Sequence, residues 1–213
     1  VTSFCQKEDF GIVASPEREA MVALNTALAT DGLVLSVKAG VNAGKMVLIS
    51  LSIGENKDIS LHLRHDVTLE DGARLSLVEI YAGSENASGY LQNPVLTRVV
   101  GKGAELTHIK LQNDAGQAIH LATVYADVAI RGLYESFTLM LGAELSRHEV
   151  HAAMRGDHGA VHVNGAQILA GQQVGDITSV ITHGAPDCVS RQTVRNVLTD
   201  RSRGVFQGKV LVE

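Results

Sequence analysis

The sequence predicts a mainly β protein built as a parallel β-helix, a solenoid of short stacked strands, with a small helical segment at its N-terminus. Apolar residues alternate with a period of two over most of the chain, and a short Gly-Ala motif recurs along it. The 213 residues are 45% hydrophobic but only 4% aromatic, with no Trp. Thin layers of Val, Leu, Ile and Ala must therefore form the core of this chain, which is long enough to bury one.

Residues 1–31 are expected to form the helical segment. Ser15 and Pro16, followed by acidic residues, are a helix start signal, with Ser as the N-cap and Pro at the first helical position. Asp31 and Gly32 end the helix. Apolar residues recur between these signals at helical spacing: Ala20, Met21, Ala23, Leu24, Ala27 and Leu28.

Residues 32–213 are expected to form the β-helix. Nine segments of this region alternate in part, are rich in β-branched residues and are bounded by Gly, Asn or Asp, and no second strong helix interrupts them. They are residues 33–37, 46–53, 58–69, 73–81, 106–112, 118–128, 134–141, 160–165 and 176–183.

A loose repeat supports the solenoid. The form Gly-Ala-charged-Leu begins at Gly72, Gly103 and Gly142, at intervals of 31 and 39 residues, with a fainter copy at Gly159. A Gly-Ala turn before each strand is typical of a solenoid that turns a corner at each copy. A Greek-key sandwich is the alternative, but it would show more hairpin signals than the single Asn-Gly at residues 164–165.

Charge and hydropathy exclude several classes of protein. The net charge is −5 and the chain has no Lys/Arg run, which argues against nucleic-acid binding; we interpret the densest basic stretch, Arg191 to Arg203, as a solvated face. No apolar run approaches 18 residues, so we expect no membrane span. With no secretory signal and only Cys5 and Cys188, the expected setting is cytoplasmic, with reduced thiols.

Histidines are candidate metal ligands. His62 and His65, with Glu70, suggest a cupin-like site, but His-x-x-His spacing places the two rings on opposite faces of a strand. Two further pairs are no better placed for a metal. These pairs are His148 with His151 and His158 with His162. A stand-alone cupin-like metal-binding protein or small-molecule enzyme therefore stays as the alternative function, although scarce aromatics argue against a sugar-processing enzyme.

One loop brings a nucleophile and a base close in sequence. His183 and Cys188 are five residues apart, with Pro186 fixing the turn between them. This spacing allows contact without enforcing it, so a structural loop is the competing interpretation.

The C-terminal part of the chain resembles the SufB/SufD family, the scaffold proteins of the SUF iron–sulfur cluster assembly system. The resemblance is carried by Asp176, Thr178 and His183, by the segment from Cys188 to Gln192, and by residues 203–212 (RGVFQGKVLV). Residues 18–37 are similar to the SufD branch of the family. The similarity extends over nearly the whole chain.

This resemblance implies a right-handed parallel β-helix that is not an enzyme and works in a complex with a SufB-like protein and the SufC-like ATPase. It implies no stably bound cofactor and a transient iron–sulfur cluster in the full complex. Cys188 and His183 are soft ligands suited to handling sulfur or iron. The residues we assign to a partner interface are Arg191, Arg195, Arg203, Phe206 and Lys209.

Family members continue beyond the strand at which this chain ends. The resemblance therefore implies that a C-terminal segment, which carries a histidine of the SufB–SufD interface and the SufC docking helices, lies outside this sequence. A solenoid that ends in mid-stack exposes an unpaired apolar edge. We expect self-association, such as a homodimer, for the isolated chain.

Overall fold

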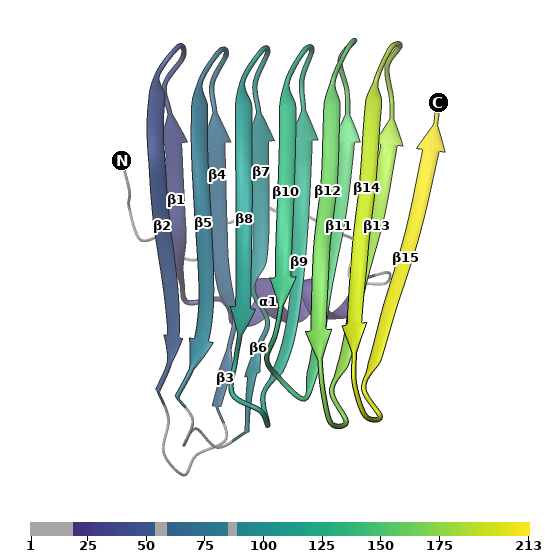
Figure 1. Ribbon diagram of the computed structural model, residues 1–213. Helices are drawn as coiled ribbons and strands as arrows, with labels where there is room; N and C mark the ends of the chain where they lie inside the picture. Colours follow the sequence, from purple (N-terminus) through teal and green to yellow (C-terminus); the bar gives the residue numbers. More distant parts are fainter. Residues whose placement is uncertain (1–18, 54–58, 85–88) are drawn as a thin grey trace.

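The computed structural model describes residues 19–53, 59–84 and 89–213, which form a parallel β-solenoid of two facing sheets (Figure 1). The chain passes from one sheet to the other and back in each coil, so the predicted β-helix is confirmed. Sheet A contains β1 (Asp31–Val37), β4 (Leu63–Leu69), β7 (Val95–Val100), β9 (Ile119–Val128), β11 (Leu145–Met154), β13 (Val174–His183) and β15 (Arg203–Val212), with the short strands β3 (Ile59–Leu61) and β6 (Tyr90–Gln92) beside them. Sheet B contains β2 (Asn42–Ser52), β5 (Arg74–Gly83), β8 (Glu105–Asn113), β10 (Leu133–Met140), β12 (Ala160–Leu169) and β14 (Val189–Leu198).

Each of the nine predicted strand segments contains a strand, and segment 58–69 is divided into β3 and β4 at His62; its first residue, Asp58, lies outside the described residues. The alternation missed β6, β7, β11, β14 and β15. Several of these, including β7, β11 and β14, carry polar side chains at positions that face the interior, so their apolar period is broken.

All strand pairs of the two sheets are parallel and stay in register through successive coils. In sheet B, Val78 pairs with Ile109, which pairs with Phe137. Only β2 begins with an irregularity, between Asn42 and Lys45. Because side chains alternate along a strand, inner residues stack on inner residues and outer residues on outer ones.

One corner of each coil, where the chain passes from sheet A to sheet B, contains a residue with a positive φ. Successive corner residues are 32, 31, 28, 27 and 29 positions apart, which is the length of one coil. They are Gly40, Gly72, Gly103, Arg131, His158 and Asp187.

The predicted Gly-Ala repeat marks this corner at only two of its copies, Gly72 and Gly103. Gly142 lies at the opposite corner, between β10 and β11, which explains the longer interval of 39 residues. Gly159 follows the left-handed His158 and is displaced by one position. The true repeat is the left-handed corner, and its sequence signal fades because the later corners use Arg, His and Asp instead of Gly.

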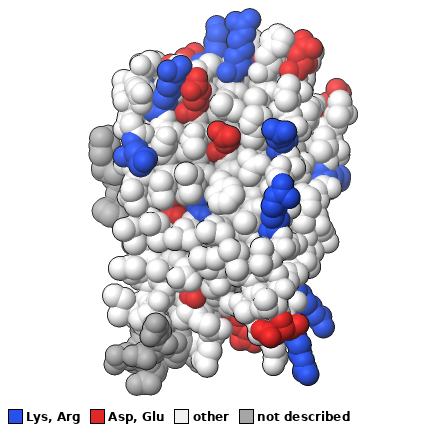
Figure 2. All heavy atoms as spheres, viewed as in Figure 1, with Lys and Arg blue, Asp and Glu red and all other residues white. Residues whose placement is uncertain are grey.

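The two outer faces differ in polarity. In Figure 1, sheet B lies in front of sheet A, and Figure 2 shows that the surface on this side is mostly uncharged. The outer face of sheet A carries exposed or half-exposed ion pairs, including Arg147 with Glu149 and Arg155 with Asp127.

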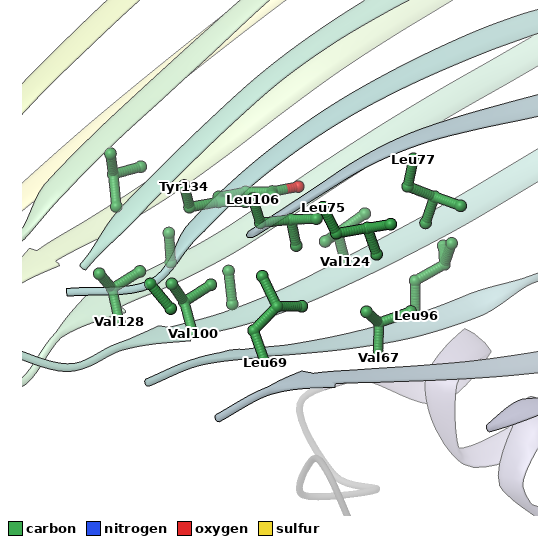
Figure 3. Close-up of a cluster of buried hydrophobic side chains, with 14 of the residues drawn as sticks. Val67, Leu69, Leu75, Leu77, Leu96, Val100, Leu106, Val124, Val128 and Tyr134 are labelled. Carbon is green, nitrogen blue, oxygen red and sulfur yellow. The ribbon is translucent and has the colours of Figure 1, made fainter. Parts of the chain in front are cut away.

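The apolar core lies between the sheets near the left-handed corners (Figure 3). Leu75, Leu106 and Tyr134 stack through sheet B, and Val100 and Val128 face them from sheet A; each is at most 3% exposed. Small and branched side chains fill the narrow space, as the composition predicts.

Helix α1 (Ala20–Leu28) lies against the outer face of sheet A (Figure 1). Asn25, fully buried, fastens it there: its Nδ2 donates to the carbonyl oxygens of Leu63 at 2.9 Å and Asn93 at 2.7 Å. Leu24 and Leu28, whose spacing helped to predict the helix, are exposed. The predicted start signal at Ser15 and Pro16 lies outside the described residues. No helix within residues 19–53, 59–84 and 89–213 is long and apolar enough to cross a membrane.

Candidate functional site

Six ionisable side chains gather inside the solenoid, in the half of the interior that is furthest from the left-handed corners. They come from inner positions of β5, β7, β8 and β9 and from the connection between β8 and β9. Each of the six is at most 5% exposed. This interior polar cluster consists of Glu79, Arg98, His108, Lys110, Asp114 and His120.

One half of the cluster is centred on the Glu79 carboxylate. Its Oε1 forms a salt bridge with the Arg98 guanidinium, and its Oε2 lies 3.1 Å from His108 Nε2. The Tyr134 hydroxyl hydrogen-bonds to His108 Nδ1 at 3.0 Å. A further Arg98 nitrogen donates to the carbonyl oxygen of His65 at 2.8 Å. The arginine on sheet A is thereby tied to the carboxylate on sheet B across the interior.

The other half is a chain of three ionisable groups. Lys110 Nζ lies 2.8 Å from His120 Nε2, and His120 Nδ1 lies 2.9 Å from Asp114 Oδ2. Because an ammonium group only donates, Nε2 accepts, and the imidazole proton is on Nδ1, facing the carboxylate. Gln112 and Tyr90 donate to Asp114 at 2.8 Å and 2.9 Å. The buried carboxylate therefore has three partners.

The charges of the cluster balance. Burial alone would raise the pKa of the Glu79 carboxyl, but Arg98 and His108 outweigh it and hold that pKa well below its usual range. The pKa of Asp114 is also lowered, since hydrogen bonds, chiefly from His120, outweigh its burial. Two carboxylates thus face two cations, Arg98 and Lys110.

The histidines of the interior are neutral. Burial lowers the pKa of His120 to about 4, and the neighbouring Lys110 cation lowers it further in the same direction. Burial also lowers the pKa of His108, against the attraction of Glu79, and that of His148, on β11. Lys110 itself has a pKa lowered to about 8 by burial, because Glu79 and Asp114 only partly compensate.

An Asp–His–Lys chain of this kind can activate an amine, but each of its members here is at most 5% exposed. Three hollows on the outer faces of the described part of the solenoid are lined by other residues and by none of the cluster. The cluster can move protons among its own members and can hold neighbouring coils together. It does not form an open active site.

Cys188 occupies the left-handed corner of the last coil. It directly follows Asp187, as Ala73 follows Gly72 and Ala104 follows Gly103, and both alanines are fully buried. The Cys188 thiol is half-buried, packs against the apolar core and lies 3.5 Å from the carbonyl oxygen of Gly156. The cysteine therefore fills the small inward position that alanine fills in earlier coils.

His183, the last residue of β13, has a different partner. Its Nε2 hydrogen-bonds to the Ser190 hydroxyl of β14 at 2.9 Å, across the turn that contains Cys188. The histidine and the thiol thus lie at the same corner of the last coil, each held by its own partner.

The five residues assigned to a partner interface lie on three different surfaces. Arg191 and Arg195 alternate with inward residues of β14 and project from the outer face of sheet B. Arg203 and Lys209 belong to the outer face of sheet A, on β15. Phe206 pairs with the buried Ile177 and points along the interior at the end of the stack, where it is 41% exposed.

The histidine pairs considered as metal ligands have separate partners. His62 Nε2 bonds to the Ser60 hydroxyl at 2.6 Å, whereas His65 Nδ1 accepts the backbone N–H of Leu33 at 3.1 Å. In the described ranges, no three His, Cys, Asp or Glu side chains are grouped so that they could hold a metal ion.

Sequence reasoning missed the interior polar cluster, although a signal for part of it was present. Glu79 lies in the predicted strand 73–81, in phase with the apolar Leu75, Leu77 and Tyr81 and not with the polar Arg74 and Ser76. A charged side chain in the inner phase of an alternating strand indicates a buried ionisable group with a partner elsewhere.

Comparison with known proteins identifies a family. The family model described as "SUF system FeS cluster assembly, SufBD core domain" matches residues 52–213. The chain is 30% identical over 197 residues to an iron–sulfur cluster assembly SufBD family protein of Synechocystis, a match covering 89% of this chain and 44% of the relative.

Two further relatives are similar over most of the chain. Iron–sulfur cluster assembly protein SufD of Escherichia coli is 25% identical over 205 residues, which is 95% of this chain and 48% of that protein. The chloroplastic protein ABCI7 of Arabidopsis thaliana is 27% identical over 191 residues, 86% of this chain and 40% of that protein. The chain spans about half the length of the curated relatives it matches.

Removing one charge from the cluster should destabilise the fold. Arg98→Met leaves the buried Glu79 carboxylate uncompensated and should lower the free energy of unfolding by about 3–5 kcal/mol. The double variant with Glu79→Leu should recover most of that loss. Urea denaturation measures both. The matched control is Arg74→Met, which breaks the exposed Arg74–Glu105 pair at 3.1 Å and should change stability by about 1 kcal/mol or less. Equal losses for Arg98→Met and Arg74→Met would contradict a compensated interior pair.

Acid should weaken the fold through the neutral histidines. Between pH 6.5, the ordinary pKa of histidine, and about 4, the folded pKa of His120, the unfolded chain binds a proton that the folded chain does not. Stability therefore falls as the pH falls through this window. His120→Gln should reduce the slope of unfolding free energy against pH by up to about 1.4 kcal/mol per pH unit. His162→Gln, on an outer face, serves as the control. An unchanged slope in His120→Gln would show that this histidine is not held neutral.

Proposed function

Because this chain belongs to the SufBD core-domain family of the SUF iron–sulfur cluster assembly system, we propose that it is a scaffold subunit acting with a SufB-like protein and a SufC-like ATPase. The observation that carries the proposal is the family match over residues 52–213, which covers nearly all of the solenoid. The iron–sulfur cluster is then transient cargo of the assembled complex and not a resident cofactor of this chain.

The physical character of the solenoid supports a scaffold without catalysis of its own, which we place in the cytoplasm. Parallel ladders hold outer side chains at fixed spacings of about 4.8 Å from coil to coil. The acid–base groups that could do chemistry are enclosed in the interior polar cluster, where Lys110 and His120 are at most 1% exposed. Such a body presents surfaces to partners and does not open around a substrate.

Within this proposal, Cys188 and His183 handle sulfur or iron during assembly. A thiol and an imidazole are ligand types that iron and sulfur chemistry uses. Their shared corner is half-buried, so a partner can cover it without the chain unfolding. The arginines of β14, with Arg203, Phe206 and Lys209 of β15, would contact partners around the same end of the stack.

The proposal is tested by reconstitution. The full-length parent protein, carrying an affinity tag, is co-expressed with the SufB-like and SufC-like proteins of its own organism, and native mass spectrometry and iron and sulfide content are measured. We expect a stoichiometric complex that forms clusters only when this subunit is present. If the chain instead purifies alone with one metal ion that survives chelation, it is a cupin-like metal protein and the scaffold proposal fails.

A single substitution tests the cysteine. Cys188→Ala should leave the melting temperature unchanged, because alanine fills the equivalent corner in earlier coils at Ala73 and Ala104. Cluster formation by the reconstituted complex should fall several-fold if the thiol handles sulfur or iron. Ser190→Ala, which removes the hydroxyl partner of His183 and keeps the thiol, is the control for a general disturbance of this corner. Normal cluster yield with Cys188→Ala would limit the cysteine to a structural role.

A further inference from the structure

The outer face of sheet B carries two unbroken apolar ladders that run along the solenoid. Strand register places their members side by side across β2, β5, β8 and β10, and the second ladder is two residues further along each strand. The ladders are Val47, Val78, Ile109 and Phe137, and Ile49, Ile80, Leu111 and Leu139.

These ladders are accessible to solvent. Val47 and Ile49 are 56% and 55% exposed, and Ile109 and Phe137 are each 40% exposed. The corresponding surface in Figure 2 is mostly uncharged. Contiguous exposed apolar surface of this kind is typical of an interaction site. It is not a general property of this solenoid, because the outer face of sheet A carries ion pairs and is covered in part by α1.

The ladders end in a basic groove. A hollow of about 520 Å³ opens beside Ile109 and Phe137 and is bounded on the far side by Arg191 and Arg195 of β14. Within the described ranges, neither arginine forms an ion pair, and the acid of this groove, Glu135, lies 3.9 Å from His162. The groove thus joins an apolar floor to two arginines, which outnumber its one acid, Glu135.

We propose that this face binds an amphipathic helical segment of a partner protein, with its apolar side on the two ladders and acidic residues against Arg191 and Arg195. Apolar burial would supply affinity, and the arginines would fix direction and favour an acidic partner. The inference goes beyond the scaffold function and does not depend on it.

The dimensions fit a helix laid across the strands. The six strands of sheet B span about 24 Å at about 4.8 Å per strand, which corresponds to a helix of about 16 residues. The chain itself shows this arrangement on its other side, where α1 lies across the strands of sheet A (Figure 1). A helix bound on sheet B would cover the outer face of that sheet, as α1 covers part of the outer face of sheet A.

A second copy of the chain fits this face less well. Two-fold pairing of sheet B with itself would bring the Arg191 and Arg195 end either over the same end of the other copy, where like charges repel, or over its β2–β5 end. The outer charges there are Lys45 and the Arg74–Glu105 pair, which offer no surplus acid. Charge complementarity therefore favours a different, acidic molecule.

Binding of a defined probe tests the surface. A fluorescent 16-residue helical peptide with a leucine face and glutamates at one end is titrated into the full chain, and its anisotropy is measured at low and high salt. We expect saturable binding that weakens with salt. A peptide with lysines in place of the glutamates should bind at least tenfold more weakly. Equal binding of the two peptides would overturn the proposal.

Variants separate the two parts of the surface. Phe137→Ser should weaken binding of the acidic peptide at least tenfold. Arg191→Glu with Arg195→Glu should do the same and should reverse the salt dependence, because salt then screens a repulsion. Arg155→Glu, which reverses an exposed cation on the outer face of sheet A, is the matched control and should bind normally. Circular dichroism checks that each variant folds. Unaltered binding by folded Phe137→Ser would place the peptide elsewhere and overturn the proposal.

Cross-linking identifies the natural occupant. A photoreactive phenylalanine derivative replaces Phe137 in the full-length protein in its own cells, and mass spectrometry sequences the peptide joined to it. An acidic amphipathic segment of another protein supports the proposal. A cross-link to a second copy, a cross-link to residues 1–18 of the same chain, or no cross-link at all would overturn it.

Discussion

The parallel register between coils is the constraint on which the rest of the solenoid depends. It stacks inner positions on inner positions, so a polar side chain that enters the interior must be neutralised by another coil or by the facing sheet, since water is excluded. Glu79 meets Arg98 from the opposite sheet, and Lys110 meets His120 in the same way. The same register lines up outer side chains, which produces both the ion pairs of sheet A and the apolar ladders of sheet B.

Alternation along single strands was enough to predict the fold class and most strands, because each strand has one face in the core and one in solvent. It failed where interior residues are polar. In β7, Arg98 occupies an inner position, and in β14 the inner residues include Ser190 and Gln192. Their neighbours belong to other coils, roughly one coil length away in sequence, and local periodicity carries no information about them.

The candidate site residues could be predicted only by chemical type. Cys188 and His183 were singled out as a thiol and an imidazole close in sequence, and the structure places both at one corner of the last coil. The interior polar cluster could not be assembled from sequence, because its six members span three coils. The assigned arginines were grouped by sequence proximity, whereas the turn between β14 and β15 sends them to opposite faces.

The interior polar cluster also makes the coils non-interchangeable. In a solenoid with a uniform aliphatic interior, one repeat can be deleted, duplicated or slipped past its neighbour with little penalty. Here, removing the coil that holds β7 and β8 would take Arg98 and Lys110 away while leaving the Glu79 carboxylate of β5 in the interior. The cluster therefore fixes the order and number of coils. It thereby keeps the surface features of each coil at one defined place along the stack.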